Sequence, residues 1–127
     1  MTSHGKTSIS DSVVEKIAGV SAAEIQGVHA MGKGRARALG AIRDRIPGGG
    51  GASPGQGVSV EVGERQAAVD LDLVVDYGVS IVSVAQAVRE NVIGNIERMT
   101  GLEVTEVNVA VDDVWMGEDE EAETRVQ

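Results

Sequence analysis

The protein is a chain of 127 residues with a formal net charge of -9, no cysteine and no phenylalanine. Without cysteine it has no disulfide framework, no thiolate metal site and no cysteine nucleophile. Aromatic residues make up 2% of the chain, so few flat side chains are present to stack on a base or a ring-shaped cofactor. No apolar run approaches the ~18 residues that span a bilayer, and the polar start shows no export signal. We therefore expect one small cytoplasmic domain built on branched aliphatic side chains.

The first regular element is predicted to be a helix that begins at Ser10 or Ser12 and ends before Gly27. Its apolar residues recur at the helical intervals of three and four, namely Val13, Val14, Ile17, Val20 and Ile25. Residues 28–31 can form a short strand after the helix, and residues 6–9 can form another before it.

The next segment is basic. Residues 33–45 hold five cations against Asp44, which gives a local charge of +4. Ala36, Leu39, Ile42 and Ile46 follow helical spacing, which predicts a short basic amphipathic helix. Such a helix can contact an anionic membrane or an acidic partner. Alternatively, its apolar side covers part of the core while the arginines face water.

Residues 47–57 contain both prolines of the protein and many of its glycines, which is typical of a flexible loop. Neither flanking part looks large enough to fold alone. We therefore predict a single domain over residues 7–115, with the basic segment and the Gly/Pro-rich loop inserted at 33–57. Residues 1–6 and 116–127 are predicted to be disordered tails.

Residues 58–62 and 69–75 alternate apolar and polar side chains, which predicts a hairpin of two half-buried antiparallel strands. Asp70, Asp72 and Asp76 should share the face that meets water. These carboxylates could also collect a weak divalent cation, but a solvated sheet face is the simpler interpretation.

Residues 80–100 carry a second helical pattern, in which an apolar stripe recurs at intervals of three and four residues: Ile81, Val84, Ala85, Val88, Val92, Ile96 and Met99. Gly101 can end this helix in the left-handed conformation. A last strand follows from Val104 to Val111, and its irregular first step predicts a bulge or a late strand start. The fold class is α+β: a two-layer sandwich of a mainly antiparallel sheet with two main helices on one face.

The sequence contains no convincing catalytic group. His29 is the only histidine outside the polar N-terminus, and no nucleophile elbow accompanies it. We expect His29 to be a structural or surface residue. No catalytic residue, metal site or cofactor is therefore predicted.

Four stretches resemble the alkaline-shock, or envelope stress response, family of small bacterial proteins: residues 11–19, 24–28, 75–78 and 99–111. The resemblance implies a non-enzymatic stress response protein that is cytoplasmic and peripheral at the inner face of the cell membrane. It also implies a scaffold or adaptor that self-associates and binds a membrane-anchored partner. The basic segment departs from this pattern.

Charge is distributed unevenly along the chain. Residues 112–127 carry seven acids against Arg125, a local charge of -6, opposite in sign to the basic segment. Trp115 can pack over a core edge or anchor an interface. The candidate partner-binding residues are Lys33, Arg35, Arg37, Arg43, Arg45 and Trp115. An alternative function is a regulatory nucleic-acid-binding module that uses residues 33–45, although the acidic chain disfavours nucleic acid.

Overall fold

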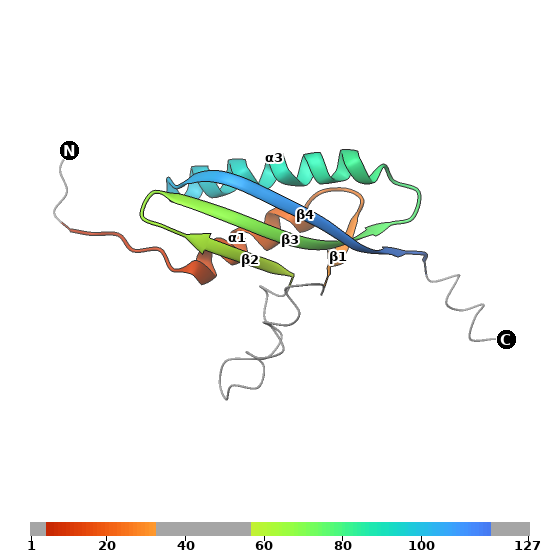
Figure 1. The fold of residues 1–127 in the computed structure, drawn as a ribbon, viewed down its shortest axis with the longest axis horizontal. Helices are drawn as coiled ribbons and strands as arrows, with labels where there is room; N and C mark the ends of the chain where they lie inside the picture. The colour runs from red at the N-terminus through yellow and green to blue at the C-terminus, as the bar shows by residue number, and fades with distance from the viewer. Residues whose placement is uncertain (1–4, 33–56, 118–127) are drawn as a thin grey trace, which may run out of the picture.

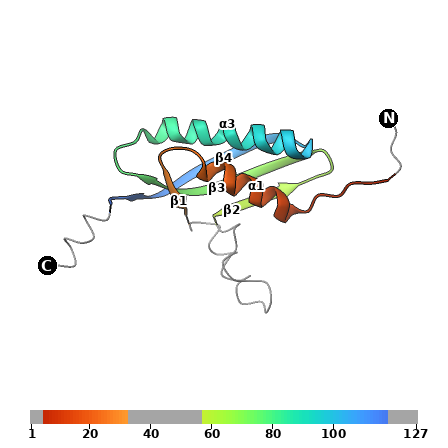
Figure 2. The ribbon, with the colours of Figure 1, turned by 180° about the vertical axis from the view of Figure 1, so that it is seen from behind.

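A computed structural model describes residues 5–32 and 57–117. It shows the predicted α+β sandwich, in which two helices lie on one face of a four-stranded sheet (Figures 1 and 2). The elements in chain order are α1 (Asp11–Ala23), β1 (Val28–Met31), β2 (Val58–Val62), β3 (Gln66–Asp76), α3 (Ile81–Thr100) and β4 (Glu103–Trp115). The basic segment and most of the glycine-rich loop lie outside the described residues.

The long strand β3 organises the sheet. Along one edge it pairs with β4 in parallel, over Gln66 to Asp76. Along the other edge it pairs antiparallel with β2 and, further on, with β1, so two of the three pairings are antiparallel. Parallel neighbours need a crossover connection, and α3 supplies it between β3 and β4 (Figure 1).

The core lies between the helices and the inner face of the sheet. Alternate residues of β3 point into it and are almost fully buried: Ala67, Val69, Leu71, Leu73 and Val75. The helix α3 contributes a stripe at intervals of four residues, Val84, Val88, Val92 and Ile96. Because α1 joins this same core through Val14 and Ile17, the parts of the chain before and after residues 33–56 fold together.

The described chain leaves and re-enters the sheet at one point on β3. The amide of Gly32 donates to the carbonyl of Asp72 at 2.6 Å, and the amide of Asp72 donates to the carbonyl of Gly57 at 2.8 Å. Gly57 has a φ of +86°, and a Cβ there would lie 2.6 Å from the carbonyl oxygen of Gly32. This crowding requires glycine, and it brings the two ends of the intervening segment together.

The helix α3 begins and ends where the sequence pattern predicts. The Ser80 side chain accepts a hydrogen bond from the amide of Ser83 at 3.3 Å, as an N-cap residue does. Gly101 ends the helix with a φ of +78°, and Leu102 behind it is buried. Of the two alternatives for the start of the last strand, the structure has the bulge: Ala67 pairs with Val104 whereas Ala68 pairs with Glu106, which leaves Thr105 unmatched.

Two predictions about the N-terminal part are wrong. Residues 6–9 form no strand, since the sheet edge beside β3 is already occupied by β1 and β2. The apolar stripe of α1 is also narrower than predicted: Val14 and Ile17 are buried, but Val13 and Val20 are 45% and 55% exposed. Met99 of α3, expected on the buried stripe, is 63% exposed.

Within the described ranges, no helix is long and apolar enough to cross a membrane.

Candidate interaction surface

The outer face of the sheet carries acidic side chains. The side chains of a strand alternate between its two faces, so the residues between the buried positions of β3 point away from the helices. Register then shows which neighbours share this face: Asp70 lies beside Ser59 and Asn108, and Ala68 lies beside Glu61 and Glu106. We call Glu61, Asp70, Glu106 and Asp113 the acidic face.

Hydrogen bonds order the middle of the acidic face. The Asn108 side-chain amide donates to Asp70 at 2.9 Å and to Glu106 at 3.1 Å. The first bond ties β4 to β3, the second lies within β4, and together they hold two carboxylates close to the same amide. Like charges at such a spacing repel one another, so a positively charged group placed between them would be attracted by both.

Asp72 differs from its neighbours and corrects a prediction. We expected a water-facing aspartate, but Asp72 is only 5% exposed. The backbone of Asp72 is hydrogen-bonded on both sides, to the amide of Gly32 and to the carbonyl of Gly57, so the chain passes this residue twice. Asp70 is exposed and Asp76 is partly exposed, so the prediction of a solvated face holds for the first and only partly for the second.

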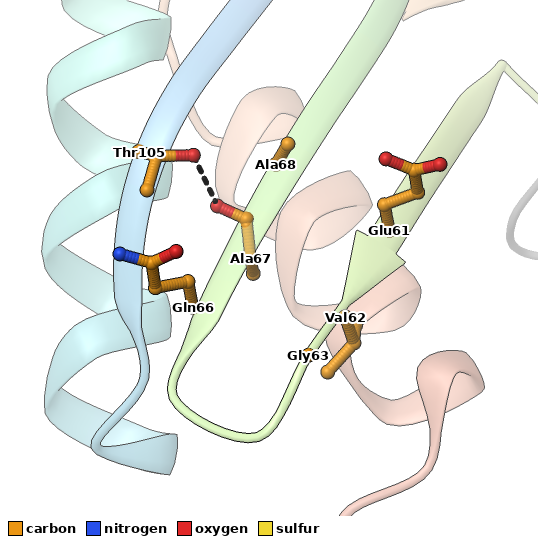
Figure 3. A pocket seen from close by; sticks show the side chains of 7 residues that line it. All are labelled: Glu61, Val62, Gly63, Gln66, Ala67, Ala68 and Thr105. Carbon is orange, nitrogen blue, oxygen red and sulfur yellow. Dashed lines mark hydrogen bonds between the residues drawn. The ribbon is translucent and has the colours of Figure 1, made fainter.

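A pocket of about 420 Å³ lies at the hairpin end of the sheet (Figure 3). The small side chains of Ala67 and Ala68 leave space there, and the Thr105 hydroxyl donates to the carbonyl of Ala67 at 3.3 Å. The polar lining side chains are Glu61, Gln66 and Thr105. A carboxylate, an amide and a hydroxyl can bind a polar group, but these three contain no base paired with a nucleophile.

An aromatic pair lies at the opposite end of the sheet. The rings of His29 and Trp115 stack with centroids 4.2 Å apart and planes 10° apart. Asp76 adds a carboxylate oxygen 3.6 Å from Nδ1 of His29. The pair joins β1 to β4 across the end of β3. His29 therefore packs against a neighbour, and Trp115 lies at the sheet end as a partly exposed side chain.

Of the six predicted partner-binding residues, the structure describes only Trp115. Lys33, Arg35, Arg37, Arg43 and Arg45 lie outside the described residues. The ring partner of Trp115 was missed by sequence reasoning, because two residues so far apart in the chain carry no shared local pattern. Over the two described ranges, no group of three or more potential ligands is placed to hold a metal ion.

Comparison with known proteins identifies the family to which this chain is similar. The alkaline-shock protein family, which is described as having a "cell envelope-related function", matches residues 1–116. A stress response regulator gls24 homolog of Streptococcus pyogenes serotype M3 is 34% identical over 119 residues, as is the serotype M1 homolog. Those residues cover 94% of this chain but 64% of each relative, so the chain spans less than two thirds of their length.

Another similar protein is the uncharacterized protein YqhY of Bacillus subtilis, which is 35% identical over 107 residues. That alignment covers 84% of this chain and 75% of YqhY. No solved structure matches the chain. The family match extends over both helices and all four strands, and the resemblance expected from the sequence is thereby confirmed: the chain belongs to the alkaline-shock family of cell envelope-related proteins.

Proposed function

We propose that this protein is a non-enzymatic scaffold or adaptor that acts in the envelope stress response at the inner face of the cell membrane. It self-associates and binds a membrane-anchored protein partner. The observation that carries the proposal is the acidic face, because neither of the described helices covers this side of the sheet, which bears carboxylates from three strands. Family membership supports the link to the envelope.

The sign of the charge favours a protein as the partner. Anionic lipid headgroups and nucleic-acid phosphates are both repelled by carboxylates. The acidic face therefore suits a basic segment of another protein, and that protein would supply the attachment to the membrane. We also propose that the six candidate residues contribute to partner binding: Lys33, Arg35, Arg37, Arg43, Arg45 and Trp115.

The test compares two double variants with the same change in charge. Asp70→Lys with Glu106→Lys reverses the acidic face, whereas Glu64→Lys with Glu90→Lys changes positions in the hairpin turn and in α3. Each tagged variant is captured from source membranes at low and at high salt. We expect the first variant to lose its membrane-fraction partner and the second to retain it.

Salt provides a second readout, since exposed charge pairs are screened at high ionic strength. Partner recovery should fall between low and high salt for the unmodified chain. Equal recovery of all forms at both salt concentrations would remove the acidic face from the proposal. A chain that is recovered without a partner and stays monomeric at native abundance would contradict the adaptor function as a whole.

A further inference from the structure

The two helices leave apolar surface that the core does not use. A groove of about 430 Å³ runs between α1 and α3, and three of its apolar side chains, Val13, Val20 and Met99, are about half exposed or more. Exposed apolar groups that gather in one concave place are typical of an interaction site. The groove is separate from the acidic face, which lies across the sheet.

Hydrogen bonds between the helices give the groove a fixed width. The Asn91 amide donates to the carbonyl of Ser21 at 2.8 Å and to the Glu24 carboxylate at 3.0 Å. The Asn95 amide donates to the Ser21 hydroxyl at 2.8 Å. These contacts also show that the helices run antiparallel, because α3 passes from Glu24 toward the start of α1. The groove is therefore formed before anything binds to it.

The charges in the groove are arranged along its length. Lys16 and Glu24 both line it, and eight residues of helix separate them by ~12 Å. Val20 lies midway between them. Arg98 follows Asn95 on α3 and donates to its side-chain oxygen at 2.6 Å, so it lies toward the Lys16 end and away from Glu24. The groove therefore has a positive end and a negative end.

We propose that the occupant of this groove is the same groove of a second copy, related by a two-fold axis that passes beside Val20. In this arrangement the two α1 helices are antiparallel. Residues four before and four after Val20 then face each other, so Lys16 meets Glu24 of the partner subunit and Glu24 meets Lys16 of the partner subunit. The two Val20 side chains meet at the axis. An interface of this kind is isologous, with one patch serving both copies.

Charge complementarity selects this occupant over others. A wholly acidic helix would satisfy Lys16 and Arg98 but would be repelled by Glu24, and a basic helix would meet the opposite conflict. A second copy satisfies both ends at once. The contact is small, because a 13-residue helix is only ~20 Å long. We therefore expect a weak dimer that forms at micromolar concentrations. This inference rests on the self-association in the proposed function.

The experiment measures the dimer dissociation constant of the full chain by sedimentation velocity over a range of concentrations. The variants are Lys16→Glu, Glu24→Lys and the double variant that exchanges the two charges. Each single variant places like charges at two positions of the dimer, and should weaken it roughly tenfold. The double variant restores both opposite-charge contacts and should return to within about threefold of the unmodified chain.

Controls separate the groove from general charge effects. Lys6→Glu and Glu90→Lys make the same charge changes outside the groove and should leave the dimer unchanged. Val20→Asp places two carboxylates at the axis and should abolish the dimer, and circular dichroism checks that each variant stays folded. Because Val20 is more than half exposed, its replacement should be tolerated by the fold.

The possible failures are distinguishable. If the chain self-associates but the single variants do not weaken it, or the double variant does not restore it, the groove is not the contact and the proposed function stands. If the chain is monomeric at every concentration, both this interface and the proposed self-association are overturned.

Discussion

The two faces of the sheet present different surfaces. The helical side is apolar between α1 and α3 and carries opposite charges at the two ends of its groove. On the outer side, the residues of the acidic face all carry negative charge, from Glu61 across Asp70 to Glu106. A surface with both signs can complement itself, whereas a surface with one sign needs a partner of the opposite charge. The two proposals therefore place the contact with a second copy and the contact with a different protein on separate surfaces of the same small domain.

The largest expected effect tests which side of β3 supports the fold. Leu73 is fully buried on the inner face, and Leu73→Ala should lower the free energy of unfolding by about 2–5 kcal/mol because it leaves a cavity. Asp70 is exposed on the acidic face, and Asp70→Ala should change the stability by less than about 0.5 kcal/mol. Urea denaturation followed by circular dichroism measures both. Similar losses for the two variants would contradict the assignment of faces.

The next effect concerns the point where the chain leaves and re-enters the sheet. Gly57→Ala forces a side chain into the left-handed region and against the carbonyl of Gly32, so a loss of about 1–3 kcal/mol is expected. Gly63→Ala is the matched control, since the nearest atom to its Cβ would be 3.7 Å away. Thermal unfolding of both variants checks this. An unaffected Gly57 variant would show that the close approach is not needed.

A smaller effect should follow from loosening the groove. Asn95→Ala removes the bond to the Ser21 hydroxyl and should cost about 1 kcal/mol. It should also weaken the dimer, because the helix spacing is no longer held. Asn108→Ala removes two bonds on the acidic face and should leave the dimer unchanged. Sedimentation velocity measures the dimer dissociation constant of both variants, and urea denaturation measures their stability. If both variants weakened the dimer equally, the helix spacing would not be what holds the dimer contact.

An effect of similar size, confined to one end of the sheet, concerns the aromatic pair. His29→Ala removes the ring that stacks on Trp115, with an expected loss of about 0.5–1.5 kcal/mol. Since Trp115 is the one tryptophan of the chain, its fluorescence reports on this site directly, and the emission should move to longer wavelength as water reaches the indole. Asp76→Asn keeps the stack and should leave the emission nearly unchanged. An emission that does not respond to His29→Ala would show that the rings are not stacked in solution.

Local physical chemistry allowed the sequence alone to predict much of the secondary structure. Alternating side chains predicted β2 and β3, the spacing of Val84, Val88 and Val92 predicted α3, and Gly101 marked its end. One step in the valine pattern was out of period, which indicated a bulge or a late strand start, and the structure has the bulge at Thr105. The family resemblance likewise depended on the order of local motifs.

Tertiary structure decided how these elements face one another. Asp72 is buried although strand alternation predicted that it would face water, and two distant glycines, Gly32 and Gly57, meet at its backbone. No period in the sequence records that meeting. Val13 and Val20 stayed exposed because α3 and the sheet covered only part of the apolar side of α1. Periodicity identifies which residues share a side of an element, but the width of the side that is buried depends on the neighbour that packs against it. The groove and the stack of His29 on Trp115 therefore emerge only in the folded protein.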